Sequence, residues 1–396
     1  MKKLIITLPF LLFANNSLLN NLKQKELNYD KQYSLQDSKD TSISWINPIM
    51  LQYSFTKDNM QNTDTYTKTF SISINQPVFK SGAIYYSIKY AAHSKAYNLL
   101  NIKLNKRALI KNALDIAYDY KIAKINEKIL RLNIENAKID IKKKKEDFLN
   151  GVGDSTFLNN AVLNLNSLLL NLEDMKMTLE NLKYSFKNIS SLDIDTLKLP
   201  VFKLINKNEY LKNNLELIKQ KKFKEVKKDL YKMQIGNQLV SVNFNASLNW
   251  QDIDYKNNTP ALKDNSLDYY RVGFSINMPI SFNALNKIEK TKIDYLKSQI
   301  LIKDKKLNLE NEYDSIIREL KAYDKKIKIY QSNIKIYDDL IESTKDSIEA
   351  GNATVLDLKI LQNSRKTMKL NIEILKLKKQ KALLNLYYKL LKWNID

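Results

Sequence analysis

The sequence predicts a mainly α-helical protein that also carries membrane β-strands and is built from two copies of one unit. Two proline-containing segments, Gln76–Gly82 and Met278–Phe282, each end a run of alternating apolar and polar residues and begin a helical pattern. The two prolines are 202 residues apart, and the glycines that end the helical patterns, Gly151 and Gly351, are 200 apart. Each unit is therefore a strand pair followed by a helical hairpin, whose first helix is about 100 Å long at 1.5 Å per residue.

The composition limits the classes of function that fit this chain. Its formal net charge is +22, which on its own would suggest a nucleic-acid or anionic-membrane partner. All but five of the 65 basic residues are lysines, however, whereas nucleic-acid readers favour arginine for its bidentate contacts. We therefore interpret the charge as a lysine-rich solvated surface and expect no nucleic-acid partner. Because the chain has no cysteine, disulfides and thiolate metal sites are excluded.

The N-terminus has the pattern of a secretory signal peptide, which we place at residues 1–16. Lys2 and Lys3 precede a short apolar run, Leu4–Ala14. The remaining chain divides into a first structural repeat, residues 17–200, and a second, residues 201–396. Besides a short helix near 20–40, the periodicity predicts strands at about 48–57, 66–78, 239–251 and 268–279 and helices at about 83–150, 154–190, 207–235, 284–350 and 354–392.

The predicted strands alternate apolar residues with serine, threonine and asparagine, as in the segment Val242–Ala246. An alternation over about 9–11 residues is typical of a barrel strand that crosses a bilayer and faces a wet lumen. The alternative is a soluble sandwich with one wet face. Because proline removes a ladder donor, we place the strand-to-helix joins at Pro77, Gly82 and Pro279. The polar segments 57–66 and 252–267 are expected to be exposed loops.

The long helices carry apolar residues at seven-residue intervals in two series. In the first long helix these are Ile102, Leu109, Ile116, Ala123, Leu130 and Ala137, and Tyr118, Ile125, Leu132 and Ile139. The two series differ by two positions, which is about 200° around a helix. A helix with apolar seams on opposite sides has a neighbour on each side, as in a curved wall of helices.

Both hairpins turn at a glycine followed by residues that favour a helix start. The glycine ends the incoming helix in the left-handed conformation, and a serine, threonine or aspartate begins the outgoing one. Thr354 and Asp357 fit a capping box, in which aspartate replaces the usual glutamate. The predicted tip residues are Gly151, Gly153, Asp154, Ser155, Thr156, Gly351, Asn352 and Thr354.

No catalytic constellation is present in the sequence. Nucleotide-binding and hydrolase motifs are missing, and the carboxylates are scattered along helix faces at spacings that suit pairs with lysine. The lone histidine, His93, is interpreted as a packing or surface residue. We therefore expect no enzyme activity, no cofactor and no metal site.

At this point the chain resembles the TolC family of outer-membrane efflux and type I secretion channels. The resemblance covers nearly all of the expected mature chain. It rests on the duplicated order of elements, the join Q-P-V-F-x-x-G at Gln76–Gly82, its partner M-P-I-S-F at Met278–Phe282, and the tip A-G-N-A-T-V-L-D-L, which begins at Ala350. The resemblance implies a homotrimer, whose strands form one 12-stranded β-barrel in the outer membrane. An α-helical barrel then continues this β-barrel into the periplasm.

The same resemblance implies what the hairpin tips do. They narrow the tube and meet a periplasmic adaptor, which is joined to an inner-membrane pump of the RND or ABC type. Asp357 falls where several members place an acid at the periplasmic entrance. The next acid of that pattern is replaced by Ile360, and Ala353 replaces a polar tip residue.

We expect the protein to be a passive exit duct of a tripartite efflux system, in contact with outer-membrane lipid. A dedicated type I protein secretion channel is an alternative within the same class. Alternatives of another class are an exported structural coiled coil, such as an adhesin, and a periplasmic adaptor. An adaptor usually has one helical hairpin surrounded by compact β domains, whereas this sequence predicts two hairpins. An adhesin would lack the barrel strands.

Overall fold

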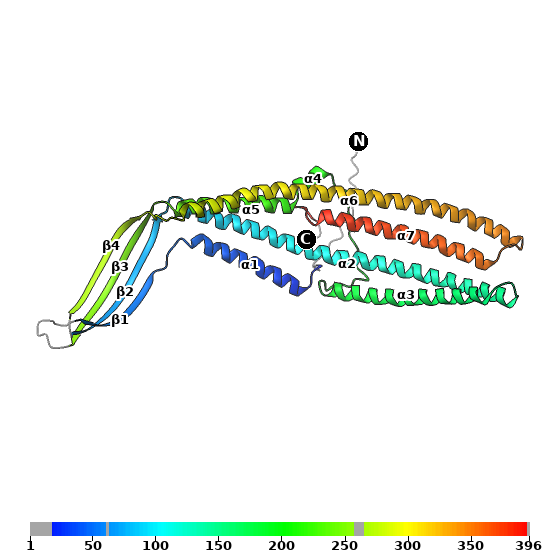
Figure 1. Cartoon of the computed structure of the whole chain (residues 1–396), viewed down its shortest axis with the longest axis horizontal. Coiled ribbons are helices and arrows are strands. Elements are labelled where there is room, and N and C mark those ends of the chain that lie inside the picture. Colours follow the sequence, from blue (N-terminus) through cyan, green and yellow to red (C-terminus); the bar gives the residue numbers. More distant parts are fainter. Residues whose placement is uncertain (1–17, 61–62, 257–264, 394–396) are drawn as a thin grey trace, which may run out of the picture. The chain divides into compact units, whose positions relative to one another are not determined.

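The structure is a computed structural model that describes residues 18–60, 63–256 and 265–393 (Figure 1). The expected signal peptide, residues 1–16, lies outside the described residues. The chain forms two compact units, each assembled from both halves of the sequence. Unit 1 contains Met1–Asn28, Lys103–Leu215 and Leu307–Asp396, and unit 2 contains Tyr29–Ile102 and Glu216–Lys306.

Two helical hairpins and one sheet make up most of the described chain. The helices are α1 (Asn21–Ile43), α2 (Ala83–Leu149), α3 (Ser155–Lys187), α4 (Lys207–Lys212), α5 (Leu215–Asn237), α6 (Ala284–Glu349) and α7 (Val355–Tyr387). The strands are β1 (Met50–Met60), β2 (Thr63–Phe79), β3 (Ser241–Lys256) and β4 (Asn265–Asn277). The chain is thus mainly helical with a small sheet, as predicted. No helix in the described part of the chain is long and apolar enough to cross a membrane.

The four strands pair in sequence order, antiparallel throughout, in a single sheet. The register places apolar residues in rows that cross the sheet. One row joins Leu51, Ile72, Leu248 and Tyr270, and the adjacent row on the other face joins Gln52, Ser71, Asn249 and Tyr269. The sheet therefore has one mainly apolar and one mainly polar face, because neighbouring residues of a strand point to opposite sides.

The strands continue into the segments 57–66 and 252–267, which the sequence analysis interpreted as loops. β1 runs to Met60, β2 begins at Thr63 and β3 runs to Lys256. Opposite charges on neighbouring strands stabilise this end of the sheet. Lys57 pairs with Asp64 at 3.1 Å, and Lys68 pairs with Asp254 at 3.2 Å.

Pro77 lies inside β2 rather than at its end. It is aligned with Asn243 of β3, and the register shifts between Pro77 and Phe79. Such an irregularity accommodates a residue that cannot donate a ladder hydrogen bond. Pro279, in contrast, lies outside the strand, two residues beyond Asn277, the last residue of β4. The two joins therefore have different geometry although their sequences are alike.

The single helix predicted at 207–235 is instead two helices, α4 and α5, separated by Asn213 and Asn214. The break has a tertiary cause, because this segment pairs with the C-terminal segment. Leu215 N–H donates to the Lys389 carbonyl at 2.7 Å, and Leu391 N–H donates to the Asn213 carbonyl at 2.7 Å. The same pairing explains why α7 ends at Tyr387 and not near residue 392, as predicted.

The linker between the repeats, residues 188–206 between α3 and α4, is held against the helices of unit 1 by tyrosine hydroxyls. Tyr118 of α2 donates to the Pro200 carbonyl at 2.5 Å, Tyr313 of α6 to that of Ile205 at 2.7 Å, and Tyr387 of α7 to that of Lys203 at 2.7 Å. Burial raises the pKa of Tyr118, so this hydroxyl remains a donor. The linker thereby crosses three helices that are far apart in sequence.

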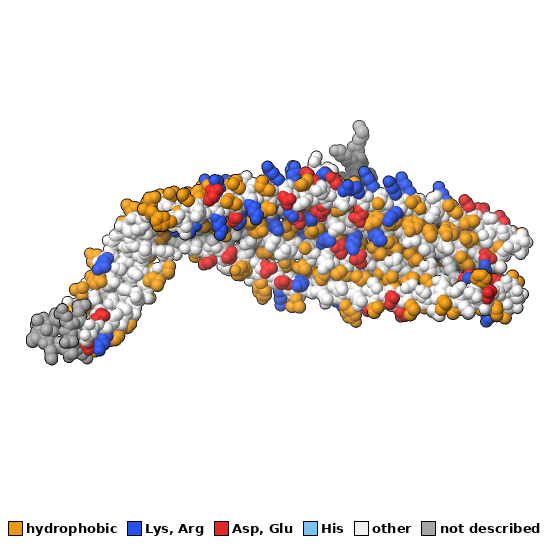
Figure 2. All heavy atoms as spheres, in the orientation of Figure 1, with side chains coloured by type: hydrophobic (Ala, Val, Ile, Leu, Met, Phe, Trp, Pro, Cys, Tyr) orange, Lys and Arg blue, Asp and Glu red, His pale blue; other side chains and the backbone are white. Residues whose placement is uncertain are grey.

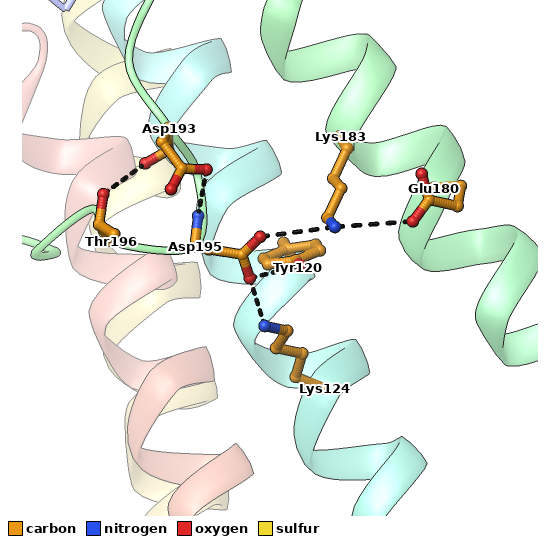
Figure 3. A network of polar contacts seen from close by, with 7 residues as sticks. All are labelled: Tyr120, Lys124, Glu180, Lys183, Asp193, Asp195 and Thr196. Carbon is orange, nitrogen blue, oxygen red and sulfur yellow. Dashed lines mark hydrogen bonds and ion pairs between the residues drawn. The ribbon is translucent and has the colours of Figure 1, made fainter.

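Asp195 is the centre of a polar network where the linker begins (Figure 3). Its carboxylate accepts from the Tyr120 hydroxyl at 2.7 Å and pairs with Lys124 of α2 and, at 3.4 Å, with Lys183 of α3. The hydrogen bonds from Lys124 and Tyr120 lower the pKa of Asp195 from its ordinary 3.8 to about 2. Because the folded pKa is lowered, the network stabilises the fold above about pH 4, and this contribution is lost as the pH falls towards 2.

We predict that Asp195→Asn removes this part of the acid sensitivity. The groups are half exposed, so the loss at pH 7 is about 1 kcal/mol. Thermal unfolding followed by circular dichroism between pH 2 and 7 measures it: the variant and the wild type should differ at pH 7 and converge near pH 2. Asp193→Asn is the matched control, because an amide oxygen can still accept from the Asp195 N–H, as Asp193 does at 3.1 Å. A constant difference at every pH would contradict the assignment.

Candidate functional site

The two hairpin tips have the same hydrogen-bond pattern, displaced by 200 residues. In the first, the N–H groups of Val152 and Gly153 both donate to the Asp147 carbonyl, at 3.0 and 3.2 Å. In the second, those of Asn352 and Ala353 both donate to the Ser347 carbonyl, at 2.8 and 3.2 Å. Gly151 and Gly351 have φ angles of +72° and +77°, the left-handed conformation that ends a helix.

The outgoing helices begin at the capping residues that the sequence predicts. Asp154 accepts from the Thr156 N–H at 2.9 Å at the start of α3. At the start of α7, Thr354 and Asp357 form the predicted capping box, in which each side chain accepts from the backbone N–H of the other residue. Ser155 is the first residue of α3. The predicted tip residues therefore all lie in the two turns or at the start of the helix that follows each turn.

The two tips differ in their surfaces. At the first tip Leu149, Val152 and Phe157 are exposed, whereas at the second the large exposed apolar side chain is Val355. The first turn is also tighter. A Cβ added to Gly153 would lie 3.3 Å from the Asp147 Cβ, whereas the corresponding residue of the second tip, Ala353, carries a Cβ. Exposed apolar residues of this kind mark a surface that can bind another protein.

Asp357 is engaged through both carboxylate oxygens. Oδ2 accepts from the Thr354 N–H at 3.0 Å and from the Thr354 hydroxyl at 2.7 Å, and Oδ1 forms an ion pair with Lys143 of α2. Asp357 therefore caps its own helix and also joins the second hairpin to the first. Sequence reasoning did not select Lys143, which lies in the run Lys142–Lys145. Four consecutive lysines point in directions about 100° apart, and the sequence alone does not distinguish them.

Further polar contacts join α2 to α7 within unit 1. The buried side chain of Asn363 donates to Glu135 at 3.0 Å and to Asn136 at 2.9 Å, and Lys359 pairs with the same glutamate at 3.3 Å. Farther from the tips, Lys381 pairs with Asp119 at 2.6 Å. The contact between the two hairpins is thus partly polar, which distinguishes it from the apolar seam that α3 presents to its neighbours.

A stripe of exposed apolar residues runs along α3. Its members are spaced by seven and are 60–69% exposed: Leu163, Leu170, Met177 and Tyr184. They lie on the side of the helix opposite its buried residues Leu172, Leu179 and Phe186. Figure 2 shows exposed apolar side chains on the strands and along the helical hairpins of the face in view. This stripe was not selected from the sequence, although its strict seven-residue spacing is visible there.

The sheet places Phe244 of β3 and Phe274 of β4 together on its apolar face. Phe244 and Phe274 are paired across the strands, with ring centroids 5.5 Å apart. Asn243 and Ser275, one position away, lie on the polar face. The Nδ1 atom of His93, which was interpreted as a packing or surface residue, lies 2.6 Å from a carboxylate oxygen of Asp229. Within residues 18–60, 63–256 and 265–393, no group of three or more acidic, histidine or cysteine residues could hold a metal ion.

Comparisons with known proteins define the class of this fold. Residues 208–390, within the second repeat, match the family described as "Outer membrane efflux protein". The Vibrio cholerae outer membrane protein VceC is similar in structure, with a TM-score of 0.75 at 11% sequence identity over 94% of both chains. The Campylobacter jejuni outer membrane channel CmeC gives a TM-score of 0.72 at 15% identity, over 94% of this chain and 83% of CmeC.

A third similar structure is the open state of the Neisseria gonorrhoeae outer membrane channel MtrE, with a TM-score of 0.66 at 12% identity over 95% of this chain and 88% of MtrE. No curated protein sequence matches significantly. The resemblance to the TolC family is confirmed, and with it the expectation of an outer-membrane efflux channel protein that extends into the periplasm. This is a family of channels and not of enzymes. The comparisons favour the channel over the adaptor and the exported coiled coil.

We predict that Gly351→Val strains the second tip. The position has open space around it but requires a positive φ, which disfavours a β-branched residue by about 1–2 kcal/mol or more. Hydrogen exchange followed by mass spectrometry should show faster exchange at the Asn352 and Ala353 amides. Gly351→Asn is the matched control, because asparagine tolerates this conformation. Equal exchange in the two variants would contradict the role of the backbone conformation.

Proposed function

We propose that this protein is the outer-membrane exit duct of a tripartite efflux system and that it acts as a homotrimer. The observation that carries the proposal is the open four-stranded sheet with one apolar and one polar face. In a bilayer the apolar face contacts lipid, and the polar face lines a water-filled lumen. The duct conducts passively, and the pump supplies the energy and the selectivity for substrate.

The sheet edges require further copies of the chain. Within the described part of the chain, β1 and β4 each pair on one side alone, so each leaves a row of backbone donors and acceptors without a strand partner. Such edges are not tolerated in contact with lipid, where closed barrels span the membrane. Closure needs about eight or more strands, and three chains supply twelve.

The exposed stripe on α3 supports the same assembly. α6 also carries apolar residues that are exposed in the single chain, among them Ile329 and Ile336 in unit 1. Residues of this kind at seven-residue spacing pack against a neighbouring helix in coiled coils. We assign the uncovered seams to contacts between copies, which close the helical barrel of the duct.

The hairpin tips are assigned to the partners. The exposed Leu149, Val152 and Phe157 of the first tip offer an apolar surface to a periplasmic adaptor, and the adaptor joins the duct to an inner-membrane pump of the RND or ABC type. A channel dedicated to type I protein secretion has the same architecture. The identity of the pump distinguishes the two.

Asp357 and Lys143 are assigned to the periplasmic entrance. If three copies of α7 converge there, each brings an acid that is already paired with a lysine of its own chain. The resulting ring has no net charge, so a ring of free carboxylates, which would select cations, is not expected in the wild type. The ion pair also holds the two hairpins of each chain together beside the tip.

We predict opposite effects of the two single substitutions on ion selectivity. Asp357→Asn leaves three lysines at the entrance and should shift selectivity towards anions, whereas Lys143→Gln leaves three carboxylates and should increase cation selectivity and block by divalent cations. Planar-bilayer recordings of reversal potential and block measure both. The double variant is the control and should return to wild-type selectivity. Unchanged selectivity in both single variants would show that the pair lies away from the pore.

We predict that lysine on the α3 stripe prevents trimer formation. Leu170→Lys and Met177→Lys replace residues that are exposed in the single chain, so the fold of each chain should be retained. Burying an unpaired lysine between copies costs about 3 kcal/mol or more. Heat-modifiable migration in gel electrophoresis of outer-membrane fractions should show loss of the trimer. Asn171→Lys, on an exposed neighbouring face of α3, should leave the trimer intact. Wild-type trimer levels in the first two variants would contradict the proposed seam.

A further inference from the structure

Lysines gather on the helices of unit 2 at the ends next to the sheet. We define the lysine girdle as six residues in the β2–α2 join, α2, α5 and α6: Lys80, Lys89, Lys228, Lys232, Lys287 and Lys290. The five on helices are exposed and lie within about 15 Å, along their helices, of the helix end that adjoins the strands. Strands and lysines are parts of the same compact unit.

The acidic residues of the same turns are largely neutralised. Asp229 is 3% exposed and pairs with His93 at 2.6 Å, and Glu289 pairs with Lys292 at 3.3 Å. In the final turns of α1, Asp37 and Asp40 are exposed on either side of Lys39 and offset part of the positive charge. The exposed charge that the helices carry beside the sheet is therefore mainly positive.

The girdle lysines of α5 lie outside its contacts with the neighbouring helices. α5 contacts α2 through the rings of Phe223 and Tyr97, 5.4 Å apart, and α6 through those of Tyr231 and Tyr295, 6.3 Å apart. At about 100° per residue, Lys232 lies about 180° around α5 from Phe223 and 100° from Tyr231, whereas Lys228 lies about 140° from Phe223 and 60° from Tyr231. Lys232 therefore points away from both neighbours, and the exposed Lys228 lies beside the contact with α6. A helix in a curved wall has its neighbours displaced towards the concave side, so Lys232 lies on the convex side.

An apolar band separates the sheet from the lysine girdle. The exposed residues of the strand-to-helix joins are Val78, Phe79, Leu239, Ile280 and Phe282. In the first turn of α2, Tyr85 is exposed, and the Lys89 amine lies 4.6 Å from the centre of its ring. The order of apolar sheet, aromatic and apolar band, and then lysine is the profile of a membrane interface, where aromatic rings and long lysine side chains reach the headgroups.

We propose that the lysine girdle binds the headgroups of anionic phospholipids in the leaflet that faces the periplasm. This inference rests on the proposed function, because it requires the sheet to lie in a bilayer. The charge is complementary, and the girdle continues the apolar surface that contacts the acyl chains. Lysines held within a Debye length of an anionic surface attract it strongly, and the attraction decreases with salt. The girdle thus fixes the depth at which the duct sits in the membrane.

Tryptophan quenching by brominated lipids tests the proposal with the full-length protein. Trp45 reports on this region, since its carbonyl accepts from Gln76 at 3.2 Å beside the end of β2. The protein is reconstituted in phosphatidylcholine bilayers with brominated phosphatidylcholine or brominated phosphatidylglycerol. We expect about a fivefold or greater preference for phosphatidylglycerol at low salt, falling towards no preference at high salt. Inorganic phosphate at the same concentration as the brominated phosphatidylglycerol should not reduce the quenching by that lipid.

The fourfold variant Lys89→Gln, Lys228→Gln, Lys232→Gln, Lys287→Gln should lose the preference, and arginine at the same positions should keep it. The matched control replaces four exposed lysines of α7 by glutamine, at Lys366, Lys369, Lys376 and Lys378, and should behave as the wild type.

Equal quenching of the wild type by the two lipids would overturn the proposal, and so would an unchanged preference in the fourfold variant. Loss of the trimer by the fourfold variant in neutral lipid would also overturn it, because that result would assign the lysines to assembly. Absence of quenching by either brominated lipid would instead refute the proposed function, because the sheet would not lie in the bilayer.

Discussion

The unpaired edges of the four-stranded sheet are the constraint on which the rest of this structure depends. A sheet with one apolar face needs lipid or another layer against that face, and this chain has no second layer to cover it among the described residues. In the proposed bilayer setting its edges need strands from other copies, because backbone groups without partners are strongly disfavoured there. Once copies surround a common axis, the helices that leave the strands must form a wall around the same axis. The two-sided seams of α2 and the uncovered stripe on α3 are what such a wall requires.

Two features fix the helices of a single chain, and they act at different places. Away from the tips, the linker is held across α2, α6 and α7 by three tyrosine hydroxyls, and the pairing of residues 213–215 with 389–391 joins α5 to the chain end. Near the tips, α2 and α7 meet through Asn363, Glu135 and the pair of Lys143 with Asp357. Apolar seams resist separation, whereas partly exposed polar contacts are weak and exchange readily with water. The tip end is therefore the part of unit 1 in which the hairpins can separate at the lowest free energy.

Local patterns predicted much of this fold. The alternation of the strands, the extent of α2 and α6, the positive φ of Gly151 and Gly351, and the capping box of Thr354 with Asp357 all follow from residues within a few positions of one another. The misses have a common cause, since each depends on a partner distant in sequence. Residues 213–214 break a helix because of residues 389–391, and the charged ends of β1 to β3 remain extended because of cross-strand ion pairs. Lys143 became visible as a candidate residue only through Asp357, 214 positions later.

The ion pair of Lys143 with Asp357 changes what the entrance of such a duct can do. A ring of free carboxylates at a narrow opening attracts cations and resists closing, because like charges at close range repel one another. Pairing each carboxylate with a lysine of its own chain removes that repulsion, and the second carboxylate oxygen is already used by the helix cap. In the proposed trimer, three such ion pairs can approach the common axis without excess charge. Opening then requires the hairpins to separate and a half-exposed ion pair to be solvated, which costs little because water solvates both ions well. Under the proposed function, an entrance of this composition would be closed by packing and opened by a partner that binds the tips, as suits a duct with no energy source of its own.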